Sequence, residues 1–212
     1  MNYLIRFEDD RALSPRVVGQ KFFYLAKAFR AGFAVPQAVA ISTEAHQSYI
    51  SHGRWPDGLL DEVFKSATNL DLSKGLSIRS SATLEDLEKQ SFAGQYRTFL
   101  KVVSEAELKD KIEECWKGAG SQAVQSYLKA RRIHHPEEQI PLMGVIMQKM
   151  VNAIAAGIAF GRNPMNPARD EIVIEAVKGL AEELVSGRLT PYRTVIDAQN
   201  KITVTPPSHE LT

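Results

Sequence analysis

The sequence predicts an α+β protein with two lobes, of which the first is rich in helices and the second in strands. Up to residue 140, apolar residues with helical spacing alternate with short strand-like runs. From Pro141 onward, short runs of branched and apolar residues follow one another, separated by turn residues. A chain of 212 residues can form two small lobes around a shared cleft. We therefore expect one lobe over 1–140 and another over 141–212.

The first lobe is expected to begin with a strand over residues 3–7 and a helix from Gly19 to Phe33. Phe22, Ala26 and Phe29 follow helical spacing in that helix, and Gly32 is placed to cap its C-terminus. The further elements expected in this lobe are a strand over 35–42, a helix capped by Thr43, a helix over 57–68, a strand over 75–81, an excursion over 82–95, a strand over 96–103, a helix opened by a capping box at Ser104 and Glu107, and a helix over 121–133.

The second lobe is expected to be a sheet. Its strands are predicted within residues 142–151, 153–162, 170–177 and 192–204, which are apolar runs rich in β-branched residues. No internal repeat and no low-complexity stretch occurs in the sequence.

Composition excludes several classes of protein. The 26 basic and 25 acidic residues give a net charge of +1, so no overall field attracts nucleic acid or an anionic membrane. The N-terminus contains acidic residues where a signal peptide needs an apolar run, and no stretch has the length of a membrane span, so we expect a cytoplasmic protein. The single cysteine, Cys115, lies in a helical pattern and is expected to be a core thiol.

The common phosphate-binding loops GxxxxGK[ST] and GxGxxG are absent, as are HExxH, CxxC and GxSxG. Two cations nevertheless stand at places suited to phosphate. Lys21 follows Gly19 in the first turn of a helix, where free N–H groups favour anions, and Arg79 ends a strand beside two serines. We expect both to converge on one anion-binding cleft. A solvated lysine and a capping arginine are the alternatives for each residue taken alone.

Three ordered strings in this chain resemble the ATP-binding module of the phosphoenolpyruvate synthase and pyruvate phosphate dikinase family. They are VVGQKFFYLAKAFRAGFAVPQAVAISTEAH, LSIRSSATLEDLEKQSFAGQYRTFLKV and GVIMQKMVNAIAAGIAFGRNPMNPARDEIVIEAVKGLAEELVSGRLTPYR, and together they extend from Val18 to about Asp197. The second string is the most specific. The sequence departs from the family pattern at Gln20, Gly161 and Ala181, none of which removes a charge used on phosphate.

The resemblance implies an ATP-grasp-like fold in which two lobes close on ATP, with the phosphoryl group passing to a histidine of a separate swivelling domain. Lys21 and Arg79 match the family's phosphate-contacting lysine and arginine. Gly94 and Thr98 match the lid over the phosphates, and Gln148 matches the strand that lines the adenine. A glycine suits the lid because a backbone that approaches phosphate closely excludes a Cβ.

The resemblance also implies Mg²⁺ as a cofactor, but the family's metal-holding acidic pair does not occur before Thr212, nor does the phosphohistidine segment. We therefore expect the chain alone to be an incomplete catalyst. A free-standing nucleotide-binding or regulatory module without transfer activity is the alternative. Nucleic-acid binding through the cationic residues 129–132 is disfavoured, because that short patch lacks interleaved aromatic residues.

Overall fold

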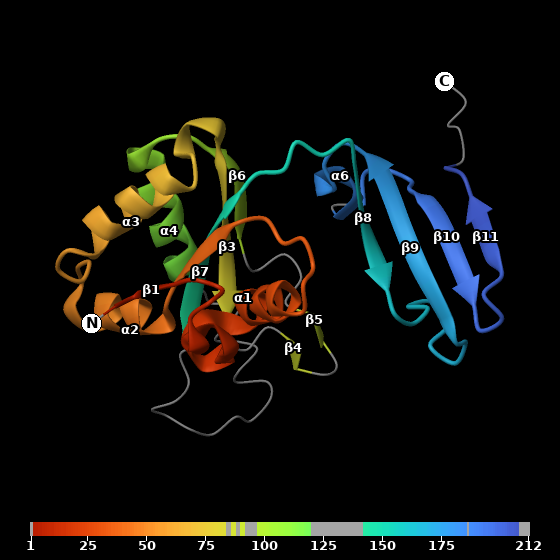
Figure 1. The fold of residues 1–212 in the computed structure, drawn as a ribbon, viewed down its shortest axis with the longest axis horizontal. Helices are drawn as coiled ribbons and strands as arrows, with labels where there is room; N and C mark the ends of the chain where they lie inside the picture. Colours follow the sequence, from red (N-terminus) through yellow and green to blue (C-terminus); the bar gives the residue numbers. More distant parts are fainter. Residues whose placement is uncertain are drawn as a thin grey trace. The chain divides into compact units, whose positions relative to one another are not determined.

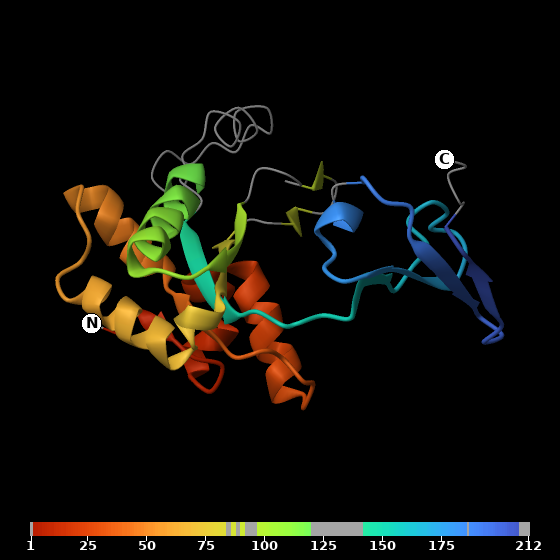
Figure 2. The ribbon, with the colours of Figure 1, turned by 90° about the horizontal axis from the view of Figure 1, so that it is seen from above.

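The computed structural model describes residues 2–83, 86–87, 90–91, 97–119, 142–185 and 187–207. Gly94, Pro141, most of the expected excursion, the expected helix over 121–133 and the cationic residues 129–132 lie outside these ranges. The chain divides into two compact units, Met1–Met150 and Val151–Thr212. Each is described by itself below (Figures 1 and 2).

The first unit contains an antiparallel sheet with the order β1 (Leu4–Ile5), β2 (Ala38–Ile41), β7 (Met143–Lys149), β3 (Leu76–Ala82) and β6 (Thr98–Val102). A separate short hairpin joins β4 (Asp86–Leu87) to β5 (Gln90–Ser91). The expectation that β7 belongs to the second lobe is wrong. β7 pairs with β2 and β3 inside the first sheet, so the first unit ends at Met150 rather than at Pro141.

Helices cover both faces of this sheet. α1 (Pro15–Arg30) lies on one face, and α3 (Leu59–Asn69) and α4 (Glu105–Ala119) lie on the other (Figure 1). α2 (Thr43–His52) packs near the start of β7, and single 3-10 turns, η1 (Asp10–Leu13) and η2 (Leu72–Lys74), complete the unit. Ile146 joins the core beneath α1, whereas Ile78 and Met147 join the core beneath α3 and α4. A strand that is covered on both faces favours apolar residues, which explains the apolar run over residues 143–147 of β7.

The helix starts follow local capping rules, with one correction. Half of the predicted capping box is confirmed, because the Glu107 N–H donates to the Ser104 hydroxyl over 3.3 Å, whereas the Glu107 carboxylate accepts from the Val103 N–H over 3.2 Å and not from that of Ser104. The predicted cap at Thr43 is wrong by one position, since Ser42 is the N-cap of α2. The Thr43 hydroxyl instead donates to the Arg16 carbonyl over 2.6 Å and so joins α2 to α1.

An aromatic cluster connects α2, α4 and the start of β7. The Trp116 ring lies 5.9 Å from the His46 ring and 4.7 Å from the Trp55 ring, measured between centroids. His46 is buried, and its Nδ1 accepts a 3.1 Å hydrogen bond from the Met143 N–H. Burial lowers the pKa of His46 to about 4 and raises the pKa of Cys115 to about 12. The expected core position of Cys115 is confirmed.

The second unit is an antiparallel sheet with the order β11 (Ile202–Thr205), β10 (Tyr192–Asp197), β9 (Glu171–Lys178) and β8 (Ala155–Phe160), accompanied by the short α6 (Glu182–Val185). β8 and β9 confirm the runs predicted within 153–162 and 170–177, whereas the run predicted over 192–204 contains two strands, β10 and β11. Asn163 organises the turn before β9, since its Oδ1 accepts from the Met165 N–H over 2.9 Å and its Nδ2 donates to Glu171 over 2.6 Å. None of the helices in the described ranges combines the length and apolar character that a membrane span needs.

Candidate anion-binding site

The candidate site begins at a break in α1. Gly19 has a φ of 73° and a ψ of 169°, which interrupts the helix so that a new first turn follows it. First-turn N–H groups have no partner within their own helix. The hydroxyl of Ser81 on β3 accepts from the Phe22 N–H over 3.2 Å, and thereby caps this turn from another element. Lys21 therefore lies in a first turn, as the sequence predicted.

Two glycines allow α1 to approach the sheet closely. A Cβ at Gly19 would lie 2.0 Å from the Ser81 carbonyl oxygen, and one at Gly144 would lie 2.7 Å from the Val18 carbonyl oxygen. Neither contact is possible for a residue with a side chain. The roles of Ser81 and Gly144 could not be predicted from the sequence, because nothing in their local pattern reveals a packing partner so far along the chain.

Lys21 reaches the strand that carries Arg79. Its Nζ donates a 3.1 Å hydrogen bond to the carbonyl oxygen of Ser80, the residue that follows Arg79. Both cations are half-buried. Arg79 stands opposite Ile146 in the sheet register, and Ile146 packs into the core beneath α1. Because cross-strand partners point to the same face, the Arg79 side chain leaves the sheet on the side covered by α1.

A buried glutamine on β7 contacts the arginine. The Nη1 of Arg79 donates to the Oε1 of Gln148 over 3.1 Å. The Nε2 of Gln148 donates in turn to the Pro36 carbonyl over 3.2 Å, and the residue is only 6% exposed. Both ends of the Gln148 amide are therefore engaged within the protein. Its expected place beside the adenine stays a prediction.

Thr98 lies next to Arg79 on the neighbouring strand, since the two are partners in the β3–β6 register. Thr98 is exposed and shares the face of Arg79. Gly94, the other residue expected in the lid, lies outside the described residues. Four of the expected site residues thus belong to the first unit and to the side of its sheet that α1 covers. Their contact with a ligand stays a prediction.

The chemistry of this group suits an oxyanion. Lys21 offers a compact ammonium, Arg79 offers a planar fork of N–H donors, and the first turn of a helix adds oriented backbone dipoles. Within the described ranges, no group of three or more His, Cys, Asp or Glu side chains is placed to hold a metal ion. The described cations therefore suit an oxyanion such as a phosphate group.

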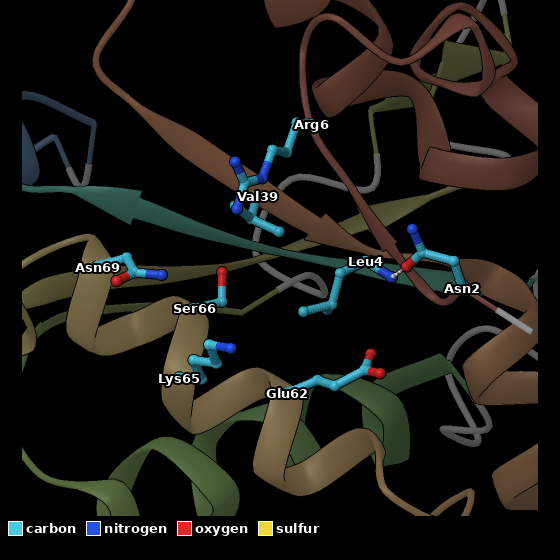
Figure 3. A pocket seen from close by; sticks show the side chains of 8 residues that line it. All are labelled: Asn2, Leu4, Arg6, Val39, Glu62, Lys65, Ser66 and Asn69. Atoms are coloured by element: carbon cyan, nitrogen blue, oxygen red, sulfur yellow. Dashed lines mark hydrogen bonds between the residues drawn. The ribbon is translucent and has the colours of Figure 1, made fainter.

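A cleft of about 320 Å³ lies elsewhere in this unit, between the β1 edge and α3 (Figure 3). Its lining residues are Asn2, Leu4, Arg6, Val39, Glu62, Lys65, Ser66 and Asn69. An adjoining cleft of about 390 Å³ shares Arg6, Val39, Ser66 and Asn69 with it. None of the expected site residues lines either cleft. A concave shape around Lys21 and Arg79 is therefore still a prediction.

A lysine and an arginine beside a helix start suit an anion such as a phosphate, and the sequence contains neither of the two common glycine-rich phosphate-binding loops. Residues 47–209 match the family described as pyruvate phosphate dikinase, AMP/ATP-binding domain. The chain belongs to this family. Arg79, Thr98 and Gln148 lie within the matched residues, and Lys21 precedes them.

Relatives support the assignment along most of the chain. An uncharacterized phosphotransferase, YvkC of Bacillus subtilis, is 34% identical over 201 residues, which cover 87% of this chain and 24% of that protein. The phosphoenolpyruvate synthase of Aeropyrum pernix is 40% identical over 121 residues, or 57% of this chain and 14% of that protein. The prodigiosin synthesizing transferase PigC of Serratia marcescens is 30% identical over 216 residues, or 92% and 24%. The chain thus spans a quarter or less of these relatives.

Proposed function

We propose that this chain is the ATP-binding part of a dikinase-like phosphotransferase of the phosphoenolpyruvate synthase and pyruvate phosphate dikinase type. One observation carries the proposal: the ammonium of Lys21 is held over 3.1 Å at the carbonyl of the residue next to Arg79. The ammonium of Lys21, which comes from α1, is thereby held against the strand that carries Arg79. Membership of the AMP/ATP-binding family supports a nucleotide as the ligand that these donors bind.

In this proposal Lys21 and Arg79 bind and orient the phosphates. Gly94 and Thr98 belong to a lid over the phosphates, and Gln148 lies on β7, the strand that lines the adenine. The two units correspond to the lobes of an ATP-grasp-like fold. The phosphoryl group passes to a histidine of a separate swivelling domain or subunit. Mg²⁺ would accompany the nucleotide and neutralise phosphate charge when bound.

Thermal denaturation with and without nucleotide tests the proposal. A ligand that binds only the folded state raises stability by RT ln(1 + [L]/Kd). With about 1 mM ATP and a Kd of about 0.1 mM, the gain is on the order of 1.4 kcal/mol, or a few degrees in Tm. The variant with both Lys21→Ala and Arg79→Ala should lose this shift. Equal Tm shifts in the wild type and the double variant would show that the nucleotide binds away from Lys21 and Arg79. The absence of a Tm shift in the wild type at several millimolar ATP or ADP would refute nucleotide binding.

A free-standing nucleotide-binding or regulatory module is the second candidate. The observation that favours it is the lack of a metal-ligand cluster among the described residues. Both candidates predict nucleotide binding, so the distinguishing measurement is phosphoryl transfer. Because the chain alone is expected to be an incomplete catalyst, the measurement uses the full-length protein that its gene encodes. Incubation of that protein with ATP labelled on its β- and γ-phosphates labels one of its own histidines, or an added phosphohistidine domain of a relative, only if the protein is a phosphotransferase.

A further inference from the structure

Gln148 occupies a position from which it can set the orientation of the Arg79 guanidinium. The two side chains come from adjacent strands, and the bond between Arg79 Nη1 and Gln148 Oε1 is 3.1 Å long. An arginine side chain has many rotamers, and fixing one of its nitrogens restricts where the remaining donors point. Gln148 is 6% exposed, so this restriction acts within a packed part of the unit.

The orientation of the Gln148 amide is itself determined by its surroundings. The Pro36 carbonyl can only accept a hydrogen bond, and the Arg79 guanidinium can only donate one. The amide therefore turns its Nε2 to Pro36, at 3.2 Å, and its Oε1 to Arg79. The backbone is fixed as well, since the Lys149 N–H donates to the Gln37 carbonyl over 2.9 Å. A glutamine satisfies both partners, whereas a glutamate or an apolar residue fails at least one.

We propose that Gln148 is a positioning residue for phosphate binding, which acts by holding the Arg79 guanidinium rather than by contacting the adenine. This inference rests on the proposed function, because it assigns Arg79 to the phosphates. It differs from the expectation that Gln148 lines the adenine, because both hydrogen-bonding ends of its amide already have partners in the protein. Gln148 thus governs affinity through the phosphate part of the ligand.

Ligands that contain only one part of ATP distinguish the two roles. Titration of the wild type and of Gln148→Leu with ATP, adenosine and inorganic tripolyphosphate measures each part separately. If Gln148 positions Arg79, the variant loses about tenfold in affinity for ATP and for tripolyphosphate, the size expected for one bond to a charged group, and nothing for adenosine. A loss confined to ATP and adenosine would assign Gln148 to the base and overturn the proposal.

A second substitution and a control separate positioning from general damage. Gln148→Glu keeps an acceptor for Arg79 but turns an oxygen toward the Pro36 carbonyl and draws the arginine charge away from phosphate, so it should also weaken tripolyphosphate binding. Ser77→Ala is the matched control: the Ser77 hydroxyl donates over 3.3 Å to the backbone carbonyl of Gln148, so its loss perturbs the same place without touching the Arg79 contact. Equal losses in Ser77→Ala and Gln148→Leu would overturn the proposal.

A double-mutant cycle completes the test. In the Arg79→Ala background, Gln148→Leu should produce no further loss of ATP affinity, because the group that it positions is gone. Additive losses would overturn the proposal. The same cycle on thermal stability without nucleotide should show coupling between the two residues, and its absence would show that the contact has no energetic weight. If the wild type binds neither ATP nor tripolyphosphate, the proposed function fails, and the positioning role fails with it even where the stability cycle shows coupling.

Discussion

Lys21 and Ser80 lie 59 residues apart in the sequence, yet the Lys21 Nζ donates to the Ser80 carbonyl oxygen over 3.1 Å. The contact depends on the break of α1 at Gly19 and on the cap that Ser81 provides to the turn that follows. It brings a mobile ammonium to the strand of Arg79.

Arg79→Ala should weaken ATP binding more than Lys21→Ala does. An arginine fork makes about two charge-assisted bonds to phosphate, each worth roughly 1.5–3 kcal/mol, against one for the ammonium. The difference should be at least about 1 kcal/mol, or roughly fivefold in Kd. Calorimetric titration of both variants measures it. Lys27→Ala, on the same helix and exposed, is the control and should bind ATP like the wild type. A larger loss in Lys21→Ala would reverse the ranking.

Gly19→Ala should destabilise the first unit strongly. The new Cβ would lie 2.0 Å from the Ser81 carbonyl oxygen, and the alanine would have to adopt a φ of 73°. We expect a loss of about 3 kcal/mol or more in the free energy of unfolding, measured by urea denaturation. Gly53→Ala separates the two causes, because Gly53 has a φ of 66° but nothing within 4 Å of its Cβ position. That control should cost about 1 kcal/mol. Similar costs for both variants would show that the close approach to Ser81 is unimportant.

Stability should fall as the pH is lowered toward 4, in part because of His46. Burial lowers the pKa of His46 from 6.5 to about 4, so the unfolded chain binds a proton more readily than the folded one between these values. The contribution of this histidine is complete above pH 6.5 and decreases as the pH falls, by about 3 kcal/mol in total.

His46→Gln isolates this contribution, because glutamine can still accept a hydrogen bond from the Met143 N–H but does not titrate. Urea denaturation at pH 7 and at pH 4.5 measures the unfolding free energy of the wild type and of the variant. Subtracting one from the other at each pH removes the contribution of the carboxylates, which is common to both proteins. The wild type should lose more stability than the variant over this interval. A difference that does not change with pH would show that His46 is protonated equally in both states.

The chain alone should bind ATP with negligible turnover. Its described residues include cations for the phosphates but no cluster that could hold a metal ion, and phosphoryl transfer depends on the metal to neutralise developing charge. Phosphate release from ATP, measured with and without Mg²⁺, should stay at the level of the buffer. Turnover that Lys21→Ala abolishes would show that this chain carries a complete catalytic site.

The sequence by itself determined the local elements and the family. Helical spacing, the Ser104 capping box and apolar strand runs depend on residues only a few positions apart, so they can be read directly. Lys21 and Arg79 could be selected because their charge and small neighbours are also local features. The expectation that Arg79 ends its strand is wrong, since Arg79 lies in the middle of β3 (Leu76–Ala82). The three family strings identified the nucleotide-binding domain, which the match over residues 47–209 confirms.

Only the tertiary structure decided how these pieces combine. It placed β7 between β2 and β3, although the apolar, β-branched composition after Pro141 had indicated that this strand belongs to the second lobe. It joined Arg79 to Gln148 across 69 positions and Gln148 to Pro36 across 112. It also brought Gly19 against Ser81. Such contacts depend on strand order and register. A strand buried on both faces carries the same apolar pattern wherever it lies in a sheet, so its neighbours cannot be read from its own residues.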